Sequence, residues 1–248
     1  INWTTPLPRD GIFWSAPALT PEGFAVAAGM STAGSITRWF RDHLGTSPIE
    51  PADAAGGERS LGAEYEKLME AADAIPPGSE GLLALPYWSG ERTPIKDPLA
   101  RGVVAGLTLR HTRAHIYRAL LESVAYGVRH NLERMAASGV THRNLVSIGG
   151  GTRNDVWMQI VADVLGQPHT VRSTSGASFG DAVLAAAGCG LLDQVGDAHA
   201  WIPHGMEFRP DARRHEFYSE IYSDYLSLYD ATREIIHRRA VTPWQGTN

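Results

Sequence analysis

Short apolar runs typical of buried strands alternate along the chain with longer stretches in which apolar residues recur at helical spacing. The most regular stretch covers residues 112–135, and Thr112 is a suitable N-cap for it. Its apolar residues recur at every fourth position, so they would share one face of a helix. They are Ile116, Leu120, Val124, Val128 and Leu132. This pattern predicts a long amphipathic helix.

The same reading predicts the other elements. Further helices are expected at residues 31–44, 62–72, 155–165, 176–187 and from 208 onward. Strands are expected at residues 24–28, 82–85, 103–107, 144–148 and 169–172. Residues 1–11 read as an extended segment, and residues 47–60, rich in Pro, Gly and acids, read as a surface loop. Strands that alternate with helices predict an α/β domain.

Composition narrows the class of protein. The chain has 248 residues, of which 43% are hydrophobic, so it can bury one large core or two small ones. A formal net charge of -5 gives no basic footprint, and we expect no nucleic-acid partner. The sequence contains no run of about 18 apolar residues and no signal peptide, which predicts a cytoplasmic protein without a membrane anchor. Because the chain starts at Ile1 rather than Met, we expect a fragment or a processed product.

The single cysteine, Cys189, lies in an apolar run and cannot form an internal disulfide. We expect it to be a small buried thiol, which fits a reducing compartment. His111 and His115 have helical i+4 spacing, but no HExxH pattern or cysteine set accompanies them, so we expect no metal site.

The most informative segment is a glycine-rich turn between a predicted strand and a predicted helix. Residues 145–154 read Leu-Val-Ser-Ile-Gly-Gly-Gly-Thr-Arg-Asn. Glycines let the backbone adopt positive φ and let a flat ligand approach the main chain, and the following helix offers free amides. Asn154 adds a donor and an acceptor suited to a purine edge or a ribose.

Other interpretations of this turn remain open. It can be a tight connection without any ligand. A Walker P-loop is excluded, because no Gly-Lys-Ser/Thr follows the glycines. A Rossmann turn requires glycine where Asn154 stands and an acid about 20 residues further on. Arg172 lies near that place and could meet a 2′-phosphate, so an NADP-dependent oxidoreductase stays as an alternative from another class.

Several segments together resemble the FGGY family of carbohydrate kinases. Residues 90–94 read Gly-Glu-Arg-Thr-Pro and residues 97–102 read Asp-Pro-Leu-Ala-Arg-Gly, as in that family. The stretch from residue 102 through His115 to Glu122 is similar to the second family signature, from which it departs at Leu120. Residues 149–154 resemble the family's adenosine motif, and residues 176–186 its small-residue helix. The resemblance covers residues 24–229 in the family's order.

This resemblance implies an actin-like (ribonuclease-H-like) ATPase fold, a mixed sheet flanked by helices, with ATP and Mg²⁺ bound in a cleft between two domains. Residues 1–248 would form the C-terminal, nucleotide-binding domain. Gly150 and Asn154 match positions that contact the adenosine, and Gly151 lies beside them. Gly34 matches another glycine of the adenosine pocket. Arg38 stands where glycerol kinases carry a glutamine that contacts the nucleotide, which leaves its role open.

The resemblance also implies which parts are missing. The family's catalytic aspartate and its phosphate loop would lie upstream of Ile1, in an N-terminal kinase domain that the chain lacks. Gly180 and Asp181 match the late small-residue helix rather than the catalytic motif. This chain alone would therefore be inactive. A homodimer is one further implication, because family members are often dimers.

The expected reaction is ATP-dependent phosphorylation of a sugar, most consistent with a pentulose such as xylulose or ribulose, since Gly-Glu-Arg-Thr-Pro is similar to xylulokinase-like members. The alternative is a non-catalytic nucleotide-binding module or the half of a pseudokinase. For the charged loop that holds Glu91, Arg92, Asp97 and Arg101, two interpretations stay open. It is either a local ion-pair network that fixes the loop or a device that positions the loop near the cleft.

Overall fold

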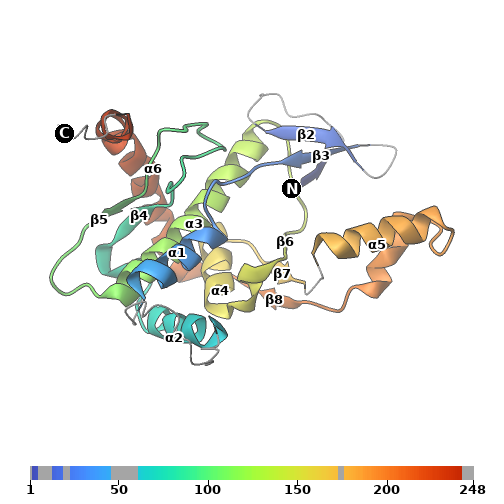
Figure 1. The fold of residues 1–248 in the computed structure, drawn as a ribbon, viewed down its shortest axis with the longest axis horizontal. Coiled ribbons are helices and arrows are strands. Elements are labelled where there is room, and N and C mark those ends of the chain that lie inside the picture. The colour runs from blue at the N-terminus through green and yellow to red at the C-terminus, as the bar shows by residue number, and fades with distance from the viewer. Residues whose placement is uncertain (1, 5–12, 19–22, 46–60, 173–175, 242–248) are drawn as a thin grey trace, which may run out of the picture.

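The computed structural model describes residues 2–4, 13–18, 23–45, 61–172 and 176–241. Within them, α3 (Arg113–Ala137) lies at the centre of the helices (Figure 1). The other helices are α1 (Gly34–Leu44), α2 (Leu61–Asp73), α4 (Asp155–Leu165), α5 (Ala177–Gly188) and α6 (Ala212–Ala240). Short 3-10 helices are η1 (Ser79–Gly81), η2 (Gly150–Arg153) and η3 (Val195–Trp201). The loop predicted at residues 47–60 and most of the predicted extended segment 1–11 lie outside the described residues.

The strands of the described residues form three small sheets. The first is antiparallel, in the order β1 (Asn2–Thr4), β3 (Phe24–Ala27), β2 (Trp14–Pro17). The second pairs β4 (Leu83–Leu85) with β5 (Val103–Ala105). The third is mixed: β6 (Val146–Ser147) runs parallel to β7 (His169–Val171), and β7 runs antiparallel to β8 (Met206–Phe208). In this third sheet β6 is an edge strand.

Helix α3 carries the core. Helices α1, α2 and α4 and strand β4 pack on it, and its side chains Tyr117, Leu120 and Leu121 are fully buried. The predicted N-cap is confirmed, since α3 begins after Thr112. It ends just before Gly139, whose φ of 91° is one that a residue with a side chain rarely adopts. The spacing thus predicted the extent of this helix, but not its burial: residues 117–127 are buried on every side, whereas Ile116, Val128 and Leu132 of the predicted apolar face are half-buried.

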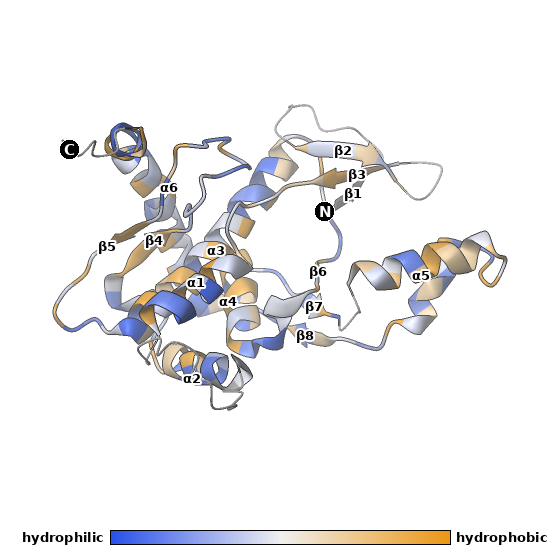
Figure 2. Cartoon of the chain, viewed as in Figure 1, coloured by the Kyte–Doolittle hydropathy of each residue, from blue (hydrophilic) through white to orange (hydrophobic). Residues whose placement is uncertain are grey.

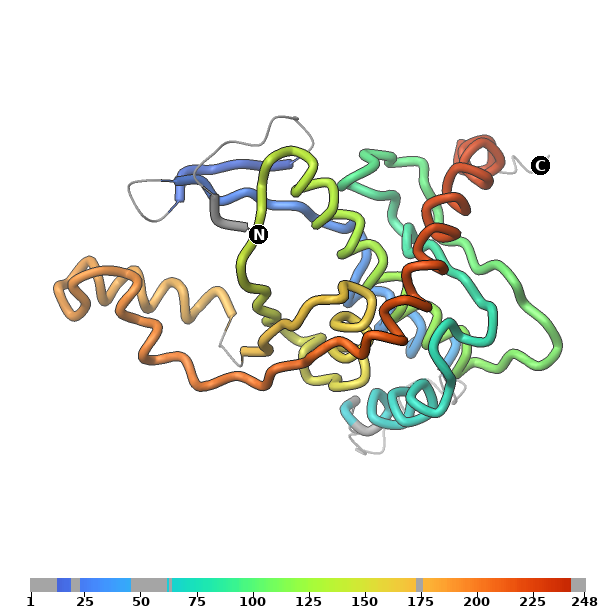
Figure 3. The backbone as a smooth tube through the Cα atoms, turned by 180° about the vertical axis from the view of Figure 1, so that it is seen from behind, coloured from blue at the N-terminus to red at the C-terminus, as the bar shows by residue number. Residues whose placement is uncertain are grey.

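Helix α6 crosses the back of the molecule against α3, α4 and β4 (Figure 3). Three of its tyrosines, Tyr218, Tyr222 and Tyr225, are buried around Tyr126 of α3. Their ring centroids lie 6.1, 6.2 and 5.4 Å from that of Tyr126, respectively. Packed aromatic rings at these separations add to the stability from apolar burial. The tyrosine stripe is therefore part of the core of this chain.

The predicted start of the last helix, at residue 208, was wrong. Phe208 is buried in strand β8, where it pairs with His169. The helix begins at Ala212, after its N-cap Asp211, whose carboxylate accepts a hydrogen bond from the amide of Arg214 at 2.9 Å. Pro210 immediately precedes this cap and favours an extended backbone.

Helix α5 and the following η3 form an arm that projects from the body (Figure 1). The arm is apolar along much of its length (Figure 2), and Leu184 and Leu191 are 45% and 76% exposed. Cys189, which caps α5, is exposed, so the prediction of a buried thiol was wrong. The run of apolar residues indicates a helix but not what covers it. None of the described helices is long and apolar enough to cross a membrane.

Candidate nucleotide-binding site

The glycine-rich turn joins β6 to α4, and each glycine has a different reason to be there. Gly149 has a φ of 100°, which favours glycine. At Gly151 a Cβ atom would lie 3.0 Å from the ring of Trp157, so packing requires a small residue. At Gly150 a Cβ atom would meet no described residue within 4 Å, and no positive φ is involved. Gly150 is thus the position where neither turn nor packing demands glycine and where the backbone is open to a ligand.

Asn154 closes this turn as the N-cap of α4. Its Oδ1 accepts a hydrogen bond from the amide of Trp157 at 3.0 Å, while its Nδ2 contacts the sulfur of Met69. One of the two polar groups expected to face a purine is therefore engaged in the cap, a use that the N-cap preference for Asn could have indicated. Asp155 follows in the first turn, and its negative charge disfavours a phosphate at this helix end. The turn fits the neutral nucleoside part of a nucleotide better than its phosphates.

Trp157 fixes the turn to the core. Its side chain is 7% exposed, and its Nε1 donates a hydrogen bond to the carbonyl of Leu121 on α3 at 3.1 Å. The glycine turn is thus supported from below by a side chain that cannot move without breaking this bond. Such support keeps the backbone amides of a binding turn in place before a ligand arrives.

Gly34 and Arg38 lie one turn apart on a separate helix, α1, and both are exposed. Within the part of the chain that the structure describes, a Cβ atom at Gly34 would meet nothing within 4 Å. The described contacts connect α1 with the glycine turn through α2. There the guanidinium of Arg41 lies 4.9 Å from the ring centroid of Tyr65, and Met69, one turn further, contacts the cap residue of α4. The structure therefore unites Gly150, Gly151 and Asn154 in one turn but leaves Gly34 and Arg38 on a neighbouring element. No local pattern in the sequence indicated that α2 would connect α1 with the glycine-rich turn.

Residues 3–189 match the model of the FGGY family of carbohydrate kinases, C-terminal domain. The chain belongs to the FGGY family. It is 33% identical over 173 residues to a xylulose kinase of Bacillus subtilis, covering 69% of this chain and 35% of that protein. It is 37% identical over 206 residues to a ribulokinase of Mycolicibacterium smegmatis, covering 82% of this chain and 36% of that protein.

The crystal structure of a xylulose kinase from Rhodospirillum rubrum superposes with a TM-score of 0.80 at 32% identity, over 95% of this chain and 45% of that one. The chain thus has the α/β, actin-like ATPase fold of these kinases, which are phosphotransferases, and spans less than half the length of the relatives that it matches.

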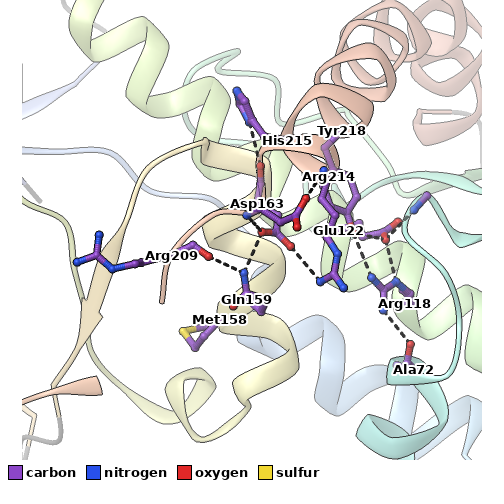
Figure 4. A network of polar contacts seen from close by, with 12 residues as sticks. Ala72, Arg118, Glu122, Met158, Gln159, Asp163, Arg209, Arg214, His215 and Tyr218 are labelled. Atoms are coloured by element: carbon purple, nitrogen blue, oxygen red, sulfur yellow. Dashed lines mark hydrogen bonds and ion pairs between the residues drawn. The ribbon is translucent and has the colours of Figure 1, made fainter. Parts of the chain in front are cut away.

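Glu122, at the end of the second FGGY signature, has a structural role here. It is 1% exposed and accepts hydrogen bonds from the amide of Gly78, the hydroxyl of Ser79, the hydroxyl of Tyr218 and Nε of Arg118, all at 2.9–3.0 Å (Figure 4). Burial raises the pKa of the Glu122 carboxyl, although the charge of Arg118 opposes the shift. The signature glutamate therefore ties α3 to the turn before β4 and to α6.

A second buried carboxylate, Asp163 on α4, organises the start of α6 (Figure 4). It accepts hydrogen bonds from Gln159 at 2.9 Å and from the amide of Asp211 at 2.8 Å, and Arg214 lies 3.4 Å away. Its backbone carbonyl accepts a hydrogen bond from His215 at 2.9 Å. The helix that carries the glycine turn at its N-terminus is thus joined to α6 at its C-terminal half.

The contacts that hold the charged loop between β4 and β5 differ from the local ion-pair network that was one of the two expectations. The carboxylate of Asp97 accepts hydrogen bonds from Tyr229 at 2.7 Å and His237 at 2.6 Å, both on α6. Arg101 donates to the carbonyls of Pro98 and Ala100 within the loop, at 3.0 and 2.8 Å. The contacts of Asp97 and Arg101 therefore join this part of the loop to α6 and to its own backbone.

The described residues include no group of three or more His, Cys, Asp or Glu side chains placed to hold a metal ion. His111 and His115 lie side by side with ring centroids 5.3 Å apart. His115 is also 3.6 Å from the carboxylate of Glu80. A Mg²⁺ ion that arrives with a nucleotide needs few protein ligands, because phosphate oxygens and water fill most of its coordination sphere.

Proposed function

We propose that this chain is the nucleotide-binding half of an ATP-dependent sugar kinase whose acceptor is a pentulose such as xylulose or ribulose. The observation that carries the proposal is the glycine-rich turn of this FGGY chain, whose backbone is open to a ligand at Gly150 and which Trp157 fixes to the core. The choice of a pentulose rests on the names of the relatives described above and on the Gly-Glu-Arg-Thr-Pro segment at residues 90–94.

The adenosine would lie on the backbone of Gly150 and Gly151, with the amide group of Asn154 as a hydrogen-bond donor. Gly34 would complete the pocket from α1, where its missing side chain leaves room. Arg38, one turn further along α1, would supply a positive charge that a nucleotide favours. Bound ATP would bring Mg²⁺, which neutralises phosphate charge in phosphoryl transfer.

The remaining parts of the active site would come from an N-terminal kinase domain. The exposed edge of the third sheet supports this partner, since Val146 and Ile148 are 57% and 60% exposed. Beside this edge lies a cavity of ≈ 390 Å³ whose lining includes Val128, Leu132 and Val161. An extended apolar segment of the N-terminal half would pair with the edge strand and fill this cavity. The catalytic aspartate and the phosphate loop would belong to the same half, in a cytoplasmic enzyme.

This function is tested on the full-length product of the gene by a coupled assay that measures ADP formation. The assay contains ATP and Mg²⁺, with xylulose, ribulose, glycerol or gluconate as the acceptor. The highest kcat/KM with xylulose or ribulose is the expected result. A clear preference for glycerol or gluconate would refute the pentulose assignment. ADP binding without any turnover would favour the non-catalytic module. The 248-residue chain assayed alone should be inactive, and its turnover would refute the placement of the catalytic base in the other half.

A further inference from the structure

The segment that leads into α1 is held by side chains from a loop far away in the sequence. The backbone at Gly29 makes three contacts with Thr93: its amide donates to Oγ1 at 2.8 Å, and its carbonyl accepts from the Thr93 amide at 3.3 Å and lies 3.4 Å from Oγ1. The carbonyl of Met30 accepts a hydrogen bond from the guanidinium of Arg92 at 2.9 Å. The amide of Ser31 donates to Oε1 of Glu91 at 2.9 Å. Three consecutive residues before α1 are thus bound by three consecutive residues of the Gly-Glu-Arg-Thr-Pro segment.

These bonds are supported from behind. Thr93 is 1% exposed and donates a hydrogen bond to Oδ1 of Asn131 on α3 at 2.7 Å. Asn131 in turn donates from Nδ2 to the carbonyl of Thr93 at 3.1 Å and to that of Gly127 at 2.9 Å. The backbone of Glu91 exchanges hydrogen bonds with that of Asp97, which α6 holds. The loop therefore connects the entry of α1 to the two longest helices of the chain.

Glu91 places an ionisable carboxyl group in a buried position, which a loop that only needs to be ordered would not require. Its side chain is 4% exposed, Oε1 accepts hydrogen bonds from the amides of Ser31 and Arg92, and Oε2 has no hydrogen-bond partner among the described residues. A carboxylate in such a place costs free energy that an apolar or amide side chain would not cost. What it provides is a charged acceptor for two backbone amides, which binds them more strongly than a neutral acceptor.

We propose that Glu91 and Thr93 are positioning residues of the kinase, which fix the backbone at residues 29–31 and thereby the N-terminus of α1, where Gly34 meets the nucleotide. This inference rests on the proposed function, because the position of Gly34 matters to a ligand only if the chain binds a nucleotide. Arg92 completes the arrangement, since its guanidinium also lies 5.4 Å from the ring centroid of Trp14 on β2.

The charge of Glu91 gives this role a signature in pH. Burial raises the pKa of Glu91 to about 7, opposed by the hydrogen bonds from the amides of Ser31 and Arg92 and by the charge of Arg92. Of the other ionisable groups nearby, Tyr87 and Tyr225 stay neutral in this range because burial raises their pKa. Lys96 and Glu91 line one surface cavity. As pH falls through about 7, Glu91 takes up a proton and holds the two amides less strongly. Nucleotide affinity should fall, whereas the raised pKa makes folding stability rise toward low pH.

The test uses ADP binding to the 248-residue chain, measured by calorimetry from pH 6 to pH 8 for matched variants. Thr93→Val keeps the shape but removes the hydroxyl, which accepts a hydrogen bond from the Gly29 amide and donates one to Asn131. ADP affinity should fall by at least about fivefold, the effect expected for losing the bond to Gly29 alone. Thr93→Ser should restore it. Glu91→Gln cannot titrate, so the ratio of wild-type to variant affinity should rise with pH, a ratio in which the titration of ADP itself cancels. Tyr222→Phe removes a hydrogen bond to Glu133 elsewhere in the core and serves as the stability control, with unchanged ADP affinity.

The outcomes separate two failures. If the wild-type chain binds no ADP at all, the proposed function is overturned and this inference with it. If the wild-type chain binds ADP but Thr93→Val behaves like Tyr222→Phe, or the ratio for Glu91→Gln does not change with pH, this inference alone is overturned. If Thr93→Val does not fold, the Glu91→Gln ratio decides the question by itself.

Discussion

Replacement of Arg118 by Met should destabilise the fold by an amount that depends strongly on pH. The substitution keeps length and apolar volume but leaves Glu122 as an unpaired carboxylate that is 1% exposed. Removal of one partner from a buried ion pair typically costs about 3–5 kcal/mol. Arg118 also donates to the carbonyl of Ala72 at 3.1 Å and to the hydroxyl of Tyr218 at 3.1 Å, and each lost bond adds about 1 kcal/mol at any pH.

The pH dependence arises because Glu122 in the variant can bind a proton and become neutral instead of remaining an unpaired buried charge. With an ordinary pKa of 4.5, protonation costs about 3 kcal/mol at pH 7 and less than about 1 kcal/mol at pH 5. Because the carboxyl's pKa in the folded variant is raised, its stability is retained at low pH and lost as pH rises. Together with the two lost hydrogen bonds, the loss relative to wild type should therefore be about 5 kcal/mol at pH 7 and between about 2 and 3 kcal/mol at pH 5.

Urea unfolding at both pH values, followed by tryptophan fluorescence, measures this difference. Arg209→Met is the matched control, because Arg209 pairs with Glu207 at 2.7 Å on the surface, where the two side chains are 73% and 44% exposed. Its loss should stay below about 0.5 kcal/mol. A loss for Arg118→Met that is equal at the two pH values, or below about 1 kcal/mol at pH 7, would refute the reasoning about the buried pair.

Two further predictions concern the nucleotide turn and the tyrosine core. Gly150→Val should leave stability unchanged, since the new side chain enters open space. It should weaken ADP binding at least tenfold, which corresponds to a steric conflict of about 1.4 kcal/mol with the ligand. Gly196→Val, also in a 3-10 helix with open space, is the control, and equal calorimetric affinities of the two variants for ADP would contradict the site. The hydroxyls of Tyr87 and Tyr225 form a buried hydrogen bond of 2.9 Å, so either Tyr→Phe change should cost about 1–3 kcal/mol in urea unfolding. The double variant should cost less than the sum of the two, and strict additivity would show that the bond contributes nothing.

The sequence predicted most of the fold where a local pattern carries the information. The period of apolar residues located α3, and α4 spans the predicted residues 155–165. Strand β8 escaped prediction because it has three residues and is stabilised by its pairing with β7, which no local pattern reveals. The exposure of Cys189 was mispredicted for a related reason, since burial depends on what packs against a helix.

The candidate site divides in the same way. The glycine turn could be read from the sequence, because strand, glycines and helix follow one another within a few residues. The physical reasons for its three glycines differ, and only the backbone and the position of Trp157 separate them. The contacts of Glu91 with Ser31 and of Arg118 with Tyr218 join residues 60 and 100 positions apart, which no single-sequence pattern indicates.

The most direct test of the central claim is a calorimetric titration of the 248-residue chain with ADP, run in parallel with NADP⁺. One ADP should bind per chain, and NADP⁺ should bind no more tightly than ADP. Absence of any adenine-nucleotide binding, or binding of NADP⁺ in clear preference to ADP, would contradict the assignment of this domain as the nucleotide-binding half of a sugar kinase.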